Sequence, residues 1–260
     1  MLNIHPMSSI SAIDISTDPV FAIPGHKTLG EFAAESMQNA LVLKKFGLDF
    51  CCGGKQTLEE ACARKQLNPG VVYRAMEAAK PEISGPNLRY REWPASFLAD
   101  FIVQTHHVYV RNALPEMVAF ATKVARVHGD RHPELHELLE IVHALNEEMM
   151  SHMHKEEHIL FPYIKALDGD SGKPGHCFPS VQSPIRVMEM EHEHAGGLVA
   201  RSREITNQFT PPEGACGSYR LLFQLLEEFE SDLHIHVHLE NNILFPAAIQ
   251  LEKQNAVSPD

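Results

Sequence analysis

The sequence predicts an all-α protein in which a small helical domain is followed by a four-helix bundle. Three observations support this prediction. Several long segments place apolar residues at helical spacing, and capping signals stand where helices would begin. One segment with His and Glu at helical spacing occurs twice, which is typical of a structural unit used twice. No segment shows the alternation of apolar and polar residues, bounded by hairpin signals, that indicates strands.

Residues 20–80 are predicted to form the small domain. It contains three short helices, and each begins at a capping pattern: two Thr-x-x-Glu capping boxes and one Asn-Pro pair. These predicted helices are 28–46, 57–66 and 68–79. Residues 1–19 lack a sustained period and are predicted to be a flexible arm. Residues 81–92 are predicted to be a linker because Pro and Gly mark their beginning.

Residues 93–250 contain four long helical patterns and are predicted to form the bundle. The first begins near Pro94 and is expected to break at Leu114-Pro115, because a proline inside a helix removes a backbone hydrogen bond. It resumes and then ends at His128-Gly129. The other three patterns run over about 134–161, 185–207 and 217–245. Residues 251–260 are predicted to be a C-terminal tail.

The repeated segment reads His-x-His-x-Glu-x-x-Ile-Leu-Phe-Pro, and its copies begin at His152 and His236. Residues four positions apart share one face of a helix. His152 with Glu156, and His236 with Glu240, therefore each present an imidazole and a carboxylate on one side. Two such pairs that face each other are the kind of ligand set with which helical bundles hold two metal ions.

The alternative is that these histidines lie on solvated helix surfaces. Apolar residues at helical spacing, Ile159 among them, fall on the faces of His152 and His236. The other histidines of the two copies fall among polar residues and are expected to face solvent: His154, His158, His234 and His238. Two inward-facing carboxylates without partners would destabilise the fold, so they indicate bound cations.

The other helices supply further candidate ligands. His192 shares its face with apolar residues and is expected to point inward. On the first bundle helix, spacing alone slightly favours His106 over His107. His128 lies about 31 Å beyond His107 along an unbroken helix. It reaches the same site only if the chain bends at Leu114-Pro115, so spacing leaves His128 undecided.

The candidate ligands are nitrogen and oxygen donors, and they are too many for one tetrahedral zinc ion. They suit two six-coordinate iron ions, bridged by the carboxylates and with at least one open position. Glu148 lies one turn before His152, and Glu191 is next to His192. Each is a candidate acceptor for the outer N–H of a ligand imidazole, and an ordinary solvated glutamate is the alternative.

Composition restricts the function further. A net charge of −12 argues against binding to nucleic acid or to an anionic membrane. No apolar run reaches the length of a membrane-spanning helix and no secretory signal is recognised, which points to the cytoplasm. An odd number of cysteines without a framework spacing fits a reducing compartment.

The order of these motifs resembles a known family. The series His…His-Gly…His-x-x-x-Glu…Glu-His…His-x-x-x-Glu resembles the hemerythrin-like bundle. The stretch Leu48-Asp-Phe-Cys-Cys-Gly-Gly-Lys-Gln-Thr-Leu58 resembles the N-terminal domain of the iron–sulfur cluster repair di-iron proteins, the repair of iron centres family. The resemblance covers about residues 22 to 250 and favours His107 over His106. The metal ligands that it implies are His107, His128, His152, Glu156, His192, His236 and Glu240.

The resemblance implies a non-haem di-iron centre, with oxo and carboxylate bridges, that counters damage to iron–sulfur clusters by nitric oxide and oxidants. The implied partners are nitric oxide or O₂, damaged iron–sulfur proteins and an electron donor, and a homodimer is left open. Three functions stay in view. They are cluster repair by iron donation or nitric oxide handling, reduction of nitric oxide to N₂O by a di-iron enzyme, and ligand binding by a sensor or carrier. No catalytic residue is assigned.

Cys51 and Cys52 form a second candidate site. Adjacent thiols do not easily form a relaxed disulfide with each other. A thiol near the N-terminus of the helix that opens at Thr57 is expected to be more acidic and more reactive than usual. The hypothesis is that the pair supplies redox equivalents to the bundle or handles iron transiently. The alternative is two small residues packed at a tight turn.

Overall fold

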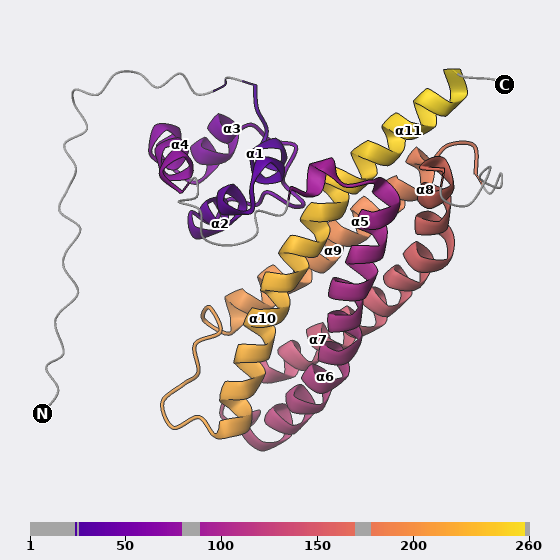
Figure 1. Ribbon diagram of the computed structural model, residues 1–260. Coiled ribbons are helices and arrows are strands. Elements are labelled where there is room, and N and C mark those ends of the chain that lie inside the picture. Colours follow the sequence, from indigo (N-terminus) through magenta and orange to yellow (C-terminus); the bar gives the residue numbers. More distant parts are fainter. Residues whose placement is uncertain (1–23, 25, 80–88, 170–177, 258–260) are drawn as a thin grey trace, which may run out of the picture.

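A computed structural model describes residues 24, 26–79, 89–169 and 178–257 of the chain (Figure 1). The described residues are helical apart from loops and one isolated bridge between Thr28 and Thr57, which confirms the all-α prediction. The predicted arm 1–19 and residues 81–88 of the predicted linker lie outside this part of the chain. Within it, no helix is both long enough and apolar enough to cross a membrane.

The small domain contains four helices: α1 (Leu29–Glu35), α2 (Met37–Lys45), α3 (Leu58–Arg64) and α4 (Pro69–Ala78). Both predicted capping boxes are present, at Thr28 and at Thr57. The prediction of one helix from Thr28 to Phe46 is wrong, because the chain turns at Ser36. The Ser36 side chain accepts a hydrogen bond from the backbone N–H of Asn39 and so caps a new helix.

The bundle consists of four long rods. They pack alongside one another, and their common direction can be followed in Figure 1. Each of three rods contains a π-helical turn, in which an extra residue widens the helix. The first rod joins α5 (Ala95–Ile102), η2 (Val103–His107) and α6 (Val108–His128), after a short 3₁₀ turn η1 (Tyr90–Glu92). The second joins α7 (Glu134–Lys155), η3 (Glu156–Leu160) and α8 (Phe161–Leu167). The third is α9 (Gln182–Ile205), and the fourth joins α10 (Gly217–Leu239), η4 (Glu240–Leu244) and α11 (Phe245–Val257).

Two predicted helix ends are wrong. Pro115 does not interrupt the first rod, because α6 continues through it to His128. The last rod does not stop at Phe245 but continues as α11 to Val257, so most of the predicted tail 251–260 is helical. The predicted stop at His128-Gly129 is confirmed.

The apolar core of the bundle has two parts. One part includes Val110 and Leu233 and extends into the small domain, whose Phe50 belongs to it. The other includes Ile102 and Leu244. The buried histidines and glutamates of the first and fourth rods lie between these two parts, and we call this region the polar layer. The small domain also contacts α10 and η4 through α1, so it stabilises the bundle at the level of this polar layer.

Candidate metal centre

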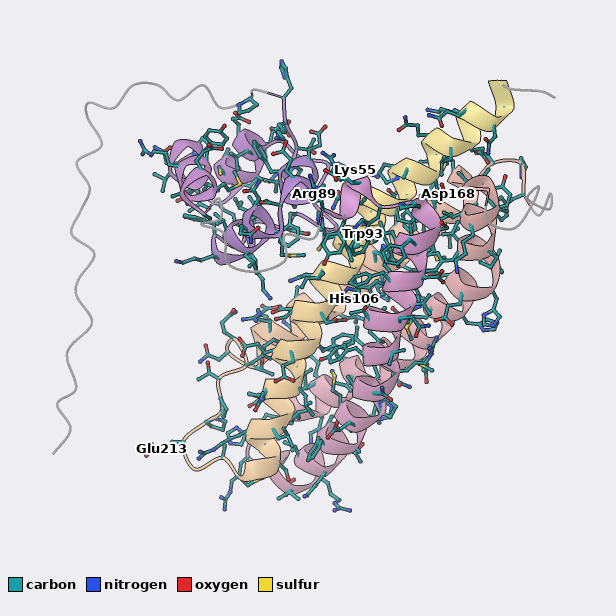
Figure 2. The ribbon with its side chains drawn as sticks, in the orientation of Figure 1. Lys55, Arg89, Trp93, His106, Asp168 and Glu213 are labelled. Atoms are coloured by element: carbon teal, nitrogen blue, oxygen red, sulfur yellow. The ribbon has the colours of Figure 1, made fainter. Side chains whose placement is uncertain are left out.

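Six side chains in the polar layer are almost fully buried, and they come from all four rods. They are His107, His152, Glu156, His192, His236 and Glu240, each at most 1% exposed. Figure 2 labels the neighbouring His106 about halfway along the bundle. The fold therefore brings both copies of the repeated motif together with one histidine from each remaining rod.

The six side chains form two groups that share both carboxylates. His107 and His236 make one group with Glu156 and Glu240, and His152 and His192 make the other with the same two glutamates. In each group the candidate ligand atoms lie within 4.8 Å of one another. The arrangement offers two adjacent positions for a cation, with two imidazoles at each and two carboxylates common to both.

Individual distances show how the carboxylates lie between the groups. The Oε1 atom of Glu240 is 3.0 Å from His236 Nε2, and its Oε2 atom is 3.0 Å from His192 Nε2. One carboxylate thus faces one imidazole of each group with a separate oxygen. On the other side, Glu156 Oε2 is 3.3 Å from His107 Nε2 and 3.2 Å from His152 Nε2. All four imidazoles direct Nε2 inward.

Several of these buried atoms lie close to one another, but none of them is aligned for a hydrogen bond with a partner among the described residues. They are His107 Nε2, both carboxylate oxygens of Glu156 and Oε2 of Glu240. Buried polar atoms are nearly always paired, because an unpaired one loses the hydrogen bonds that water would provide. Unpaired atoms that converge on one place from several helices fit a site whose missing partners are cations.

The pKa values describe the same site without metal. Burial works against a charge on His107 and His152, but Glu156 and its neighbouring carboxylates raise the pKa of His107 to about 9 and that of His152 to about 10. Burial and the charge of Glu240 work against ionisation of Glu156, but His152 and His107 lower its pKa to about 2. The metal-free centre therefore balances two carboxylates with two imidazolium groups, and a cation would take the place of protons.

The outer nitrogens of three imidazoles have polar partners. His107 Nδ1 is 2.7 Å from Glu157 Oε1, His152 Nδ1 is 2.9 Å from Glu191 Oε2, and His192 Nδ1 is 2.9 Å from Asn241 Oδ1. Such partners fix the tautomer that leaves Nε2 free for a metal. The Nδ1 atom of His236 is buried and has no partner among the described residues.

The sequence suggested Glu148 and Glu191 as acceptors for the outer N–H of a ligand imidazole. Glu191 does contact such an imidazole, that of His152. Glu148 does not reach a buried imidazole, because its carboxylate pairs with Nδ1 of His194 at 2.8 Å on the exposed face. Glu157 and Asn241 were not identified from the sequence as partners of the candidate ligands. Each directly follows a motif glutamate, and this adjacency is the signal that could have found them.

The π-helical turns explain why spacing favoured His106, although His107 is the residue that lies with the other candidate ligands. His107 ends η2, while Glu156 and Glu240 open η3 and η4. The extra residue of a π turn rotates the following residues around the helix axis, so a period of 3.6 assigns the wrong face. His106 is buried beside the centre, where its Nδ1 is 2.8 Å from Asp232 Oδ1. Ile159, predicted to face inward, is 48% exposed for the same reason.

The structure does not bring His128 to the other candidate ligands. Because α6 is continuous from Val108, His128 lies at the far end of the bundle, and its Nε2 is 3.3 Å from the Sγ atom of Cys216. The bend that would have brought it to His107 is absent.

The prediction that the outer histidines of both copies face solvent holds for one copy only. His154 and His158 are exposed. His238 is buried, because the small domain covers it: its ring lies 5.5 Å from that of Phe50, and its Nδ1 is 2.9 Å from Asn242 Nδ2. Burial lowers the pKa of His238 to about 4. His234, on the same side, is partly buried.

The Cys51–Cys52 loop lies against this covered face. The two Sγ atoms are 4.0 Å apart and form no disulfide. Asp49 holds the loop by accepting hydrogen bonds from the backbone N–H groups of Cys51, Cys52 and Gly53. The hydrogen bond with Cys52, followed by burial, raises the pKa of Cys51 well above its usual value. The expectation of an unusually acidic thiol is therefore wrong for Cys51.

A groove of about 930 Å³ opens beside the two thiols, between α2 and α9. Its lining includes Lys44 and Lys45 on one side and Gly196 and Gly197 on the other. Both cysteines line this groove, and Cys52 is the more exposed of the two.

Two family models match the chain. A model described as the hemerythrin HHE cation binding domain matches residues 99–248, and a domain of unknown function called ScdA_N matches residues 25–80. The chain is 40% identical over 231 residues to the iron-sulfur cluster repair protein YtfE of Pectobacterium atrosepticum, covering 87% of this chain and 98% of that protein. It is 39% identical over 221 residues to the protein of the same name from Escherichia coli O81, covering 85% and 96%.

Proposed function

The chain belongs to the family of the YtfE iron-sulfur cluster repair proteins, and on this premise we propose that it repairs iron–sulfur clusters damaged by nitric oxide or by oxidants. The observation that supports the proposal most directly is the pair of buried His–His groups that share Glu156 and Glu240. A family name alone would leave open whether this chain retains a working centre, and the six buried candidate ligands that gather from all four rods support the view that it does.

The proposed cofactor is a pair of non-haem iron ions. One ion would be held by His107 and His236, the other by His152 and His192, and both by Glu156 and Glu240. Four donors at each position leave room in a six-coordinate shell for a bridging oxygen and for an added ligand. Nitrogen and oxygen donors without thiolate are the set that carboxylate-bridged iron sites in helical bundles use.

Bound iron would supply redox chemistry and affinity for nitric oxide, and the protein would control access and orientation. The two apolar core parts above and below the polar layer exclude bulk water from it. Glu157, Glu191 and Asn241 hold three imidazoles in the orientation that ligation needs. The proposed partners are damaged iron–sulfur proteins, nitric oxide or O₂, and an electron donor.

A second candidate is a di-iron nitric oxide reductase that forms N₂O. The specific observation in its favour is that the two cation positions share both carboxylates, so that two ions there would be neighbours. Two neighbouring ions could each take one nitric oxide molecule. We also propose a reducing, cytoplasmic setting, because none of the four cysteines in the described part of the chain forms a disulfide.

A repair assay tests the main proposal. An iron–sulfur enzyme is inactivated with nitric oxide and then incubated without O₂ with the iron-loaded protein. We expect enzyme activity to recover, and we expect no recovery with a Glu156→Leu, Glu240→Leu variant that has lost its iron. If the wild-type protein carries two irons per chain and consumes nitric oxide but restores no activity, the repair function is wrong and the reductase takes its place.

A further inference from the structure

The Cys51–Cys52 loop has a direct hydrogen bond to one of the candidate metal ligands, His192. The thiol of Cys52 donates a hydrogen bond to the backbone carbonyl of His192, with an S–O distance of 3.4 Å. Asn241 also links the same loop to the imidazole of His192 through hydrogen bonds. The small domain therefore contacts one candidate ligand on both its backbone and its side chain.

Asn241 makes the second contact with the two ends of one amide. Its Oδ1 atom accepts the hydrogen bond of His192 Nδ1 at 2.9 Å, and its Nδ2 donates to the backbone carbonyl of Cys51 at 3.4 Å. An amide is planar, so the two ends cannot turn independently. If the His192 imidazole is fixed by a metal on Nε2, Oδ1 is fixed by Nδ1, and Nδ2 is then directed at the loop.

The neighbouring Asn242 can be compared with Asn241. Asn242 also donates to the loop, from Nδ2 to the carbonyl of Phe50 at 2.9 Å, but among the described residues its hydrogen bonds do not include a candidate ligand. Its other partner is His238. The two asparagines thus hold the same loop from the same π turn, and only Asn241 also holds an imidazole of the centre.

We infer that Asn241 is a positioning residue that couples metal loading to the Cys51–Cys52 loop. The inference rests on the proposed metal centre. When a metal fixes the His192 imidazole, Asn241 is held in place by Nδ1, and its Nδ2 then holds the loop that carries the Cys52 thiol more firmly. By reciprocity, a change at the Cys52 thiol that loosens the loop weakens metal binding by the same free energy by which the metal stabilises the loop. The protein would in this way link the state of its thiols to how tightly it holds its iron.

The test measures metal affinity and thiol accessibility in the same proteins. Cobalt(II) is titrated without O₂ and followed by its absorption, and the rate at which iodoacetamide modifies Cys52 is measured by mass spectrometry with and without cobalt. In the wild-type protein we expect cobalt to slow modification of Cys52 by roughly five-fold or more. Protein already modified at Cys52 should bind cobalt more weakly, and the loss of affinity measures the coupling.

Three variants separate the contacts. Asn241→Asp keeps an acceptor for His192 Nδ1 and removes the donor to Cys51, so cobalt should still bind but should no longer slow modification of Cys52. Asn241→Leu removes both contacts and should also weaken cobalt binding by roughly 10- to 100-fold. In Asn242→Leu, modification should be faster in both states, with cobalt affinity and the effect of cobalt retained.

The inference is overturned if cobalt still slows modification in Asn241→Asp, because the metal would then protect the thiols by another route, such as direct binding. It is also overturned if Asn242→Leu loses the effect of cobalt as completely as Asn241→Asp. If the wild-type protein binds no cobalt at all, the proposed metal centre is wrong, and this outcome is distinct from a centre that binds metal without affecting the loop.

Discussion

Single hydrogen bonds decide how firmly each imidazole of the centre is held. His107 and His152 have carboxylate partners on Nδ1, His192 has an amide, and the buried Nδ1 of His236 has none among the described residues. A carboxylate on the outer nitrogen makes the inner nitrogen a stronger donor to metal. The position that combines His107 with His236 therefore has one strongly supported and one unsupported imidazole.

The contact between Glu191 and His152 leads to a first prediction. Glu191→Leu should weaken cobalt binding by roughly 10- to 100-fold, because His152 loses the carboxylate that orients it. Glu148→Leu is the matched control, since Glu148 pairs with the exposed His194, and it should leave cobalt affinity unchanged. Absorption titrations of the two variants give the comparison. Equal losses in both would mean that surface charge, and not the hydrogen bond, sets the affinity.

The assignment of histidines on the first rod gives a second prediction, on metal stoichiometry. His107→Leu removes a ligand from one of the two positions, so the variant should bind fewer irons per chain than the wild-type protein. His128→Leu should bind as many as the wild type, because His128 lies at the other end of α6 beside Cys216. Iron analysis after anaerobic loading and gel filtration provides the number. Loss of iron in the His128 variant would restore that residue to the ligand set.

At the scale of helices, the π turns mark both what the sequence could predict and where prediction failed. The repeated motif identified both His–Glu pairs, because His152 and His236 are each followed by a glutamate four residues later, near the start of a π turn. The choice between His106 and His107 could not come from a period of 3.6, because η2 adds a residue just there. The burial of His238 depends on a domain far away in the sequence.

Pro115 gives a prediction for helix stability. It is exposed and lies inside α6, where a proline removes a hydrogen bond and costs roughly 3 kcal/mol. Pro115→Ala should therefore raise the free energy of unfolding of the metal-free protein by about 1–3 kcal/mol, measured in urea. Pro162→Ala is the control, because Pro162 stands in the first turn of α8, where proline is tolerated. A gain at Pro162 as large as that at Pro115 would contradict this explanation.

At the scale of the whole molecule, the small domain packs against the bundle at the level of the polar layer. A layer of buried charge between two apolar core parts destabilises a metal-free bundle, and the small domain covers the layer where η4 carries Glu240. Binding of a cation to the folded state alone stabilises it in proportion to the affinity. Metal, bundle and small domain should therefore respond together to heat and to pH.

This leads to a prediction on pH and thermal stability. Cobalt(II) at about a hundred times its dissociation constant should raise Tm by about 5–11 °C. The raised pKa values of His107 and His152, about 9 and 10, stabilise the metal-free fold below pH 6.5, and this contribution is lost as pH rises through 9 to 10. The same protons compete with metal. At a fixed cobalt concentration, the rise in Tm should therefore be larger at pH 8 than at pH 6.

The Glu156→Leu, Glu240→Leu variant serves as the control for this experiment, because it lacks both shared carboxylates and should show no rise in Tm with cobalt at either pH. Calorimetry of the two proteins at both pH values, with and without cobalt, gives four differences in Tm to compare. A rise that is equal at both pH values would mean that the metal does not displace protons from His107 and His152. The charge balance derived for the metal-free centre would then be wrong, even if the ligands are the right ones.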